Sequence, residues 1–322
     1  MRKAICTLII GVAALGTTAC TSSVDQSDEL AGDRASDMTE RALDAPGFVD
    51  FLAVDGESVW TTNRGMVEQW SPTEKIAEVA IPTPCGTMAV LAQSLWVANC
   101  EGGNLYRVDT ASASTVAIIE TGIAEPRGET NVVAGAGSVW VPSEASGVIA
   151  RIDPASNEVI AKIEVVPGTF FLAFGFDALW AVSSEAQLLQ RIDPHTNSVT
   201  GTALLGNQPG FLAAGEGAVW VQEQRDGTVA RILPDTLEID TRTLVGESLL
   251  YGDIDVGAGK VWLRTTEDQI FVTLDAATGE IIGRYGDAAG SGAVRYTQSR
   301  VWTTAHDIDR VSWWTASEMQ LP

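Results

Sequence analysis

The amino-acid sequence predicts an all-β protein, a seven-bladed β-propeller built from four-stranded antiparallel blades. The first observation is a repeat of seven units, each with one tryptophan in the same short apolar pattern. The gaps between successive tryptophans are 36, 44, 40, 40, 42 and 40 residues. A period of about forty residues, divided into several short strands, is typical of propeller blades. The seven tryptophans are Trp60, Trp96, Trp140, Trp180, Trp220, Trp262 and Trp302.

The second observation is the turn chemistry inside each unit. Residues 211–245 contain four strand-length runs, with hairpin turns at 215–217 and 225–227. The inner runs are apolar almost throughout, as expected for sheets covered on both faces by neighbouring blades. The outer runs alternate polar and apolar residues, because one side meets solvent. No segment has a sustained helical period, so we expect almost no helix.

The third observation concerns the two ends of the repeat. The last unit supplies strand-length runs at 294–297, 300–304 and 310–315 but lacks a clear fourth run. Residues 38–43 resemble the fourth run of an earlier unit, 198–204. We therefore expect an N-terminal strand to join the last blade, which would close the ring and remove its exposed edge. The predicted propeller domain spans residues 37–322.

The N-terminus resembles a bacterial lipoprotein signal peptide. Two basic residues precede the apolar run 4–16, and the small residues 17–19 lead to Cys20. The motif departs from the usual pattern at Thr17, where leucine is commonest. The resemblance implies a signal peptide over 1–19, a lipid on Cys20 that anchors the protein to a membrane, and export to the periplasm or cell exterior. An ordinary secretory signal with a free Cys20 thiol is the alternative; the acidic, polar segment 20–36 is predicted to be a disordered tether.

The remaining cysteines are explained by export. Cys85 and Cys100 both fall in the second unit, at the start of its first strand and the end of its second. A hairpin that turns near Gln93 brings these two positions opposite each other. The sequence therefore predicts a disulfide between them, in an oxidising compartment. A metal or redox site would need more ligands than two cysteines, and no histidine lies nearby.

The chain is strongly acidic. Its formal net charge is −22, and removal of the two basic residues of the signal would make it more negative. Nucleic acid is therefore excluded as an expected partner, because its phosphates would be repelled. No clustered Asp pattern of a calcium loop is present. We predict no cofactor, no metal site and a monomer.

One face of the predicted ring gathers the candidate ligand-binding residues. The turn between the second and third strands of a blade, and the link from one blade to the next, emerge on the same face. The link 122–130 is the longest, and long loops more often bind ligands. Ordinary solvated surface residues remain the alternative for every one of these positions. The ligand-binding candidates are Arg127, Glu129, Tyr251, Asp253, Arg64 and Arg264.

Two opposite charges stand at a position where the other units carry small or aliphatic residues. Seven residues before its tryptophan, the sixth unit has Asp255 and the seventh has Arg295. This position belongs to the strand nearest the axis. We expect the two side chains to form a partly buried pair that closes the central channel. An anchor for a polar ligand is the alternative.

Several units resemble the YVTN and virginiamycin B lyase-like β-propeller repeats. The resemblance spans residues 46–315 and rests on runs such as Gly-Ser-Val-Trp-Val at 137–141 and Arg-Ile-Asp-Pro at 151–154. It implies a seven-bladed propeller, often exported, with ligands on one face near the axis. Members that cleave streptogramin rings use a divalent metal held by His and Glu residues.

The metal-dependent chemistry carries over only in part. His306 lies on the expected face, Asp307 follows it, and Glu223 occupies a Trp-x-x-Glu position, so these three are the catalytic candidates. The other histidine, His195, lies in a turn on the opposite face. We therefore expect a non-catalytic, lipid-anchored scaffold that binds a protein or small-molecule ligand on this face. A metal-assisted lyase or hydrolase is the alternative.

Overall fold

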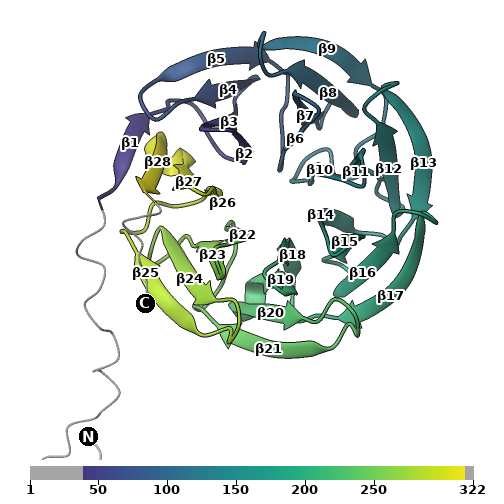
Figure 1. Ribbon diagram of the computed structural model, residues 1–322, viewed down its shortest axis with the longest axis vertical. Helices are drawn as coiled ribbons and strands as arrows, with labels where there is room; N and C mark the ends of the chain where they lie inside the picture. The colour runs from purple at the N-terminus through teal and green to yellow at the C-terminus, as the bar shows by residue number, and fades with distance from the viewer. Residues whose placement is uncertain (1–38, 316–322) are drawn as a thin grey trace, which may run out of the picture. The chain divides into compact units, whose positions relative to one another are not determined.

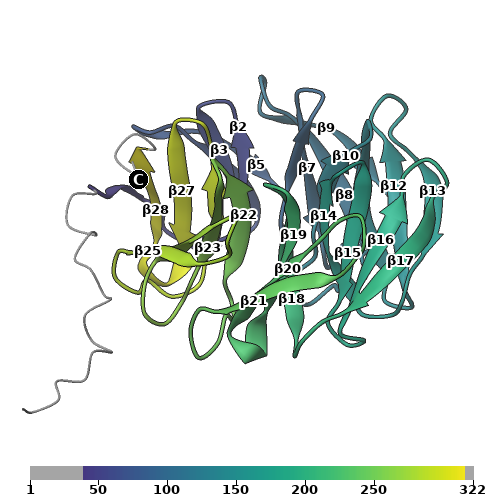
Figure 2. The same cartoon turned by 60° about the horizontal axis from the view of Figure 1, so that its bottom comes forward.

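The computed structural model describes residues 39–315, which form a closed ring of seven four-stranded antiparallel sheets (Figure 1). Figure 2 shows the sheets standing side by side around the ring. The predicted signal peptide, Cys20 and the tether 20–36 lie outside the described residues. Within 39–315 no helix is long and apolar enough to cross a membrane. The predicted seven-bladed propeller is confirmed.

Four consecutive strands make each of the first six blades, and the described residues contain no helix beyond two short 3-10 turns, η1 (Gln224–Asp226) and η2 (His306–Ile308). From the axis outwards, blade 1 contains β2 (Leu52–Asp55), β3 (Ser58–Asn63), β4 (Met66–Trp70) and β5 (Lys75–Ala80). Blade 2 contains β6 (Ala89–Leu91), β7 (Ser94–Asn99), β8 (Asn104–Asp109) and β9 (Ser114–Ile119). Blade 3 contains β10 (Val133–Gly135), β11 (Ser138–Glu144), β12 (Val148–Asp153) and β13 (Glu158–Glu164).

The next three blades follow the same plan, and blade 4 contains β14 (Thr169–Gly175), β15 (Ala178–Ser183), β16 (Leu188–Asp193) and β17 (Ser198–Leu204). Blade 5 contains β18 (Pro209–Gly215), β19 (Ala218–Glu223), β20 (Thr228–Ile232) and β21 (Ile239–Leu244). Blade 6 contains β22 (Asp253–Gly257), β23 (Lys260–Arg264), β24 (Phe271–Asp275) and β25 (Ile281–Tyr285).

The seventh blade combines the two ends of the described chain. Its strands are β26 (Val294–Tyr296), β27 (Arg300–Ala305), β28 (Arg310–Thr315) and, outermost, β1 (Arg41–Asp44). β1 pairs antiparallel with β28, and Leu43 stands opposite Val311. The backbone N–H of Ala45 donates to the carbonyl of Asp309 at 2.8 Å, which extends the pairing beyond the strand. The predicted closure of the ring by an N-terminal strand is therefore confirmed.

The seven repeated tryptophans lie in the second strand of each blade and are buried, with exposures of 0–2%. Each packs in a hydrophobic cluster with residues of the following blade. Trp262, for example, stacks on Tyr296 of the seventh blade with ring centroids 5.4 Å apart. In four blades the indole N–H donates to the carbonyl five residues earlier, which satisfies the polar atom of a buried ring. The tryptophan repeat thus determines the spacing between blades.

Arginines in the third strand extend this contact to the next blade. Arg151 stands opposite Trp140 and its guanidinium lies 4.6 Å from the indole centroid, a cation–π distance. Its Nε donates to the hydroxyl of Ser138 at 2.9 Å. Its Nη1 donates to the carbonyl of Pro194 and to the side-chain oxygen of Asn197 in the following blade. Arg107 makes the equivalent bonds in the second blade. A single side chain therefore joins two blades.

The fourth blade has the arginine without these bonds. Arg191 lies 6.0 Å from the centroid of Trp180. The residue forty positions beyond Asn197 is Leu237, which has no amide to accept its N–H groups. Leu237 also adopts a positive φ of 64°, a conformation that asparagine tolerates better than leucine. Ala178 likewise stands forty positions beyond Ser138, so two of the three acceptors used by Arg151 are absent at this junction.

We predict that Arg151→Ala destabilises the ring more than Arg191→Ala. The Arg151→Ala variant loses hydrogen bonds to the next blade as well as the cation–π contact. Its free energy of unfolding should therefore be lower than that of Arg191→Ala by about 1–3 kcal/mol. Chemical denaturation monitored by tryptophan fluorescence measures both variants against the wild type. Equal losses of stability would contradict the role assigned to the bonds between blades.

Candidate functional site

A pocket of about 730 Å³ opens where the links between blades meet the turns that follow the second strands. The links into blades 1, 2, 3, 6 and 7 contribute walls, as do the turns of blades 1 and 7. The pocket therefore draws on both kinds of loop that the sequence placed on one face. Its principal side chains are Phe48, Asp50, Asn63, Arg64, Cys85, Arg127, Glu129, Tyr251, Ser291, His306 and Asp307.

Six of the nine residues predicted to bind ligand or to act in catalysis line this pocket. They come from blades 1, 3, 6 and 7, which are far apart in sequence. Tyr251 is 66% exposed and held by a backbone of positive φ. The six are Arg64, Arg127, Glu129, Tyr251, His306 and Asp307.

Arg264 lies behind the pocket and does not line it. Its side chain is fully buried, at 0% exposure, and donates to the carbonyls of Thr304 and Ile270, each at 3.1 Å. Burial lowers the pKa of Arg264 to about 10, and nearby carboxylates, Asp50 foremost, act in the opposite direction. Arg264 therefore joins the sixth and seventh blades and contributes positive charge beneath the pocket.

Asp253 also lies inside the ring, at 2% exposure. It lines a second cavity of about 250 Å³ formed by the inner strands, and its carboxylate pairs with Arg295. The expected pair of Asp255 with Arg295 is thus wrong in its acidic partner. Asp255 instead accepts the backbone N–H of Tyr296 at 2.7 Å, although Arg295 still acts on its charge.

Glu223 is separated from the other two catalytic candidates. Its carboxylate accepts the N–H of Arg242 at 2.9 Å and the hydroxyl of Thr228 at 2.7 Å. It also accepts the backbone N–H of Gly206 at 2.7 Å, and its exposure is 0%. These bonds occupy its oxygens, and Glu223 is not among the pocket residues.

His306 and Asp307 are neighbours at the rim of the pocket. The imidazole of His306 stacks on Phe48 with ring centroids 4.0 Å apart, and its Nδ1 lies 3.2 Å from a carboxylate oxygen of Asp307. Burial lowers the pKa of His306, and Asp307 opposes this shift. The guanidinium of Arg64 lies 5.8 Å from the centre of the Phe48 ring. Phe48 thus lies next to both the imidazole of His306 and the guanidinium of Arg64 at the rim.

Asp50 is the titratable residue among the described pocket residues that the sequence reasoning missed. Burial raises its pKa to about 8, and the negative charge of Glu129 adds to this effect. Burial likewise raises the pKa of Glu129 to about 7, with Asp253 adding to it. Perturbed carboxyl groups in a cavity are a mark of functional sites.

A positional signal in the sequence could have found Asp50. It stands ten residues before its tryptophan, and it is the only charged residue at that place in the seven units. The six others are Gly86, Thr130, Phe170, Gly210, Gly252 and Gly292. Eleven residues before the tryptophans stand four further pocket residues, Cys85, Glu129, Tyr251 and Ser291.

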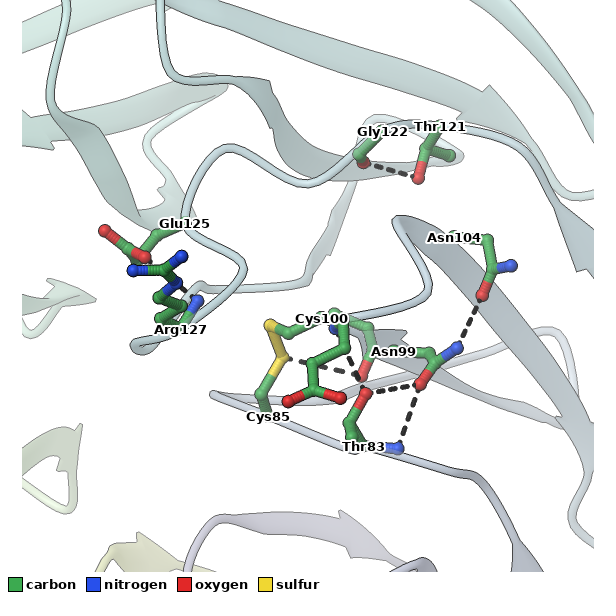
Figure 3. The surroundings of a disulfide bond; sticks show 11 residues. Thr83, Cys85, Asn99, Cys100, Asn104, Thr121, Gly122, Glu125 and Arg127 are labelled. Carbon is green, nitrogen blue, oxygen red and sulfur yellow. Dashed lines mark hydrogen bonds between the residues drawn. A yellow bond between two sulfur atoms is a disulfide. The ribbon is translucent and has the colours of Figure 1, made fainter.

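The predicted disulfide is confirmed and supports one wall of the pocket. Cys85 and Cys100 are bonded, with their Cα atoms 6.0 Å apart. Figure 3 shows the bond, with Arg127 and Glu125 of the long link 122–130 in its surroundings. Gly86 continues this wall with a φ of +70°, and a Cβ there would lie 1.7 Å from the carbonyl oxygen of Thr130. A glycine at this position lets the links into blades 2 and 3 meet.

The described residues do not fit a divalent metal. Among residues 39–315, no three His, Cys, Asp or Glu side chains are grouped so that they could hold a metal ion. His306 and Asp307 lie together, but Glu223 is engaged elsewhere.

Solved structures share the fold. The chain is similar to virginiamycin B lyase from Staphylococcus aureus, with a TM-score of 0.71 and 18% identity over 86% of this chain and 99% of that one. It is also similar to a streptogramin B lyase, with a TM-score of 0.70 and 15% identity over 86% of this chain and 97% of the other. The predicted resemblance to this type of propeller is confirmed at the level of fold. No protein-family model and no curated protein matches the sequence.

We predict that Asp50→Asn stabilises the protein increasingly as the pH rises. The unfolded chain ionises Asp50 near its ordinary pKa of about 4, whereas the folded protein retains the proton up to about pH 8. The folded state therefore binds the extra proton between these values, and wild-type stability falls with rising pH. The amide cannot ionise and escapes this loss.

Thermal unfolding across about pH 4 to pH 8.5 tests this prediction. The gain in Tm of Asp50→Asn should be smallest at the acid end and reach its maximum above pH 8. Asp235→Asn, at an exposed position in a turn of blade 5, is the control. A gain that does not vary with pH would contradict the assigned titration.

Proposed function

We propose that this protein is an exported, lipid-anchored β-propeller that binds a ligand in the pocket around Phe48, Tyr251 and His306 and does not transform it. The observation that carries the proposal is the pocket itself. Its volume of about 730 Å³ falls within the range of about 300–1,000 Å³ typical of small-molecule sites. A small molecule or the end of a peptide therefore fits better than a flat protein surface.

Export is supported by the disulfide and by the N-terminal sequence. The Cys85–Cys100 bond is of a kind that persists in oxidising compartments. The basic and apolar residues before Cys20 match a lipoprotein signal. A lipid on Cys20 would hold the propeller at a membrane, facing the periplasm or the cell exterior.

A binding role is supported by the state of the catalytic candidates. Glu223 is bound by Arg242 and Thr228 outside the pocket. His306 has its ring against Phe48, and Asp307 accepts the backbone N–H of Ser291 at 3.1 Å. Each of these side chains thus has a structural partner.

The alternative is a lyase or hydrolase. It is favoured by the carboxyl groups of Asp50 and Glu129, whose pKa values of about 8 and 7 suit proton transfer near neutral pH. The structural neighbours are named as lyases of virginiamycin B and streptogramin B. Elemental mass spectrometry of residues 37–322 and of His306→Ala distinguishes a metal enzyme, because only an enzyme of that type would hold about one equivalent of metal and lose it in the variant.

The anchor predicts covalent labelling at one cysteine. Cells grown with an alkyne fatty acid should label the wild-type protein, which should fractionate with membranes. Cys20→Ser should lose both the label and the membrane association, because it lacks the acceptor thiol. An unlabelled, soluble wild-type protein with a free thiol would show that the signal is an ordinary secretory one.

The binding site predicts ligands that depend on the pocket face. In a thermal-shift screen of small molecules, hits should raise the Tm of the wild type but not that of a Tyr251→Ala, Arg127→Ala double variant. His195→Ala, in a turn outside the pocket, is the matched control and should respond like the wild type. Hits that survive the double substitution would refute the site, and conversion of a hit into product would support the enzyme.

A further inference from the structure

The inner part of the pocket has two carboxyl groups without a partner. Asp50 and Glu129 come from the links into blades 1 and 3 and line the same cavity. Within residues 39–315, neither carboxyl has a hydrogen-bond donor or an ion-pair partner. The negative charge of Glu129 acts on Asp50 across the pocket that both residues line. Both residues are partly buried, so their carboxyl groups lose hydration without gaining donors, and a bound cation or N–H donor would compensate for this loss.

The cavity behind them has the same shortage of donors. Asn131, two residues after Glu129 in the chain, lines this second cavity, and its side chain is 3% exposed. Its Nδ2 donates to the carbonyl of Leu172 at 3.0 Å, while its Oδ1 has no partner. Gln222, at 0% exposure, repeats the pattern: its amide nitrogen donates to the carbonyl of Asp253, and its Oε1 is unpartnered. One buried acceptor without a donor, Oδ1 of Asn131, therefore lines this second cavity, and a second, Oε1 of Gln222, lies outside its lining.

The charges around the axis do not balance. Four acidic side chains, Asp50, Glu129, Asp253 and Asp255, are accompanied by the two arginines Arg264 and Arg295. Arg264 directs its N–H groups to backbone carbonyls, and Arg295 pairs with Asp253. The other arginines of the pocket, Arg64 and Arg127, are exposed at the rim, where water screens them. Arg264 acts on the charge of Asp50 without bonding to its carboxyl group, and no arginine acts on Glu129, so the two carboxyl groups are only partly balanced by positive charge.

Aromatic side chains stand beside this acidic floor. Phe48 and Tyr251 both line the pocket. Aromatic faces next to carboxylates suit an organic cation, since they accept its apolar part and attract its charge.

We propose, on the basis of the ligand-binding function above, that the pocket is specific for a ligand with a cationic amine, whose charged nitrogen lies between Asp50 and Glu129. The apolar part of the ligand packs on Tyr251, whose side chain is 66% exposed, on the side of the pocket that Phe48 also lines. The ligand class is an amine or guanidine attached to an apolar or aromatic group.

Binding of such a ligand is coupled to pH. The cation favours the ionised forms of Asp50 and Glu129, which retain protons near neutral pH, so binding releases protons. Affinity should increase from about pH 6 to about pH 8.5. The charged groups that act on these two carboxyls are Asp253, Arg264 and Asp307, and the other titratable groups lining the pocket are Arg64, Arg127, Tyr251 and His306.

Three probes that differ only in charge test the proposal. Tyramine is a cation, tyrosol is its neutral alcohol, and 4-hydroxyphenylacetate is the corresponding anion. Calorimetric titration of the full chain should give a Kd for tyramine about tenfold or more below those of the other two. Asp50→Asn with Glu129→Gln should remove this preference and should fold, because it eliminates two unfavourable charges. Glu185→Gln, an exposed carboxylate outside the pocket, is the matched control.

The outcomes separate this inference from the binding function itself. A tyramine preference that tightens with pH and is lost in the double variant supports the proposal. Equal or tighter binding of the alcohol or the anion, or tyramine binding that survives the double substitution, overturns it while leaving ligand binding intact. Failure of all three probes also overturns it, and the loss of every pocket-dependent hit in the thermal-shift screen would overturn the binding function as well.

Discussion

A buried tryptophan in the second strand of each blade packs against the blade that follows, and the rest of the structure depends on this contact. A four-stranded sheet cannot bury both of its faces alone, so each blade needs a neighbour. The indole fills the space between them, and the arginines opposite Trp96 and Trp140 add polar bonds to the next blade. The strand β1 completes the last blade and leaves the ring without an open edge.

Because the ring holds the blades at a regular spacing, it brings together links that are distant in the chain. Asp50 and Asp307 line one pocket although about 250 residues separate them. The geometry of such a site is determined mainly by the blades on which the links begin and end, and the Cys85–Cys100 bond supports one of its walls. The stability of the surrounding β-sheets offsets the cost of polar residues in unfavourable environments, so such residues can be retained at the axis.

The regular features could be predicted from sequence because they repeat. The tryptophan spacing was sufficient to predict seven blades. The unmatched strand-length runs at the two ends were sufficient to predict how the ring closes. Six pocket residues were predicted because loop positions in a blade determine the face. Arg264 and Glu223 were not distinguished from them, since burial within a junction depends on the neighbouring blade. Asp50 required a comparison of the same position across all seven units, where glycine predominates.

The disulfide has a consequence for where the protein can be active. The Cys85–Cys100 bond closes a segment that lines the pocket, and both cysteines pack in the cluster of Trp96, which is one of the seven tryptophan contacts between blades. In a reducing cytoplasm the ring could form while this wall remained unfastened. Oxidation of the two thiols would then fasten this wall of the pocket. The bond thus makes the geometry of the pocket, more than that of the ring, depend on the redox conditions around the protein.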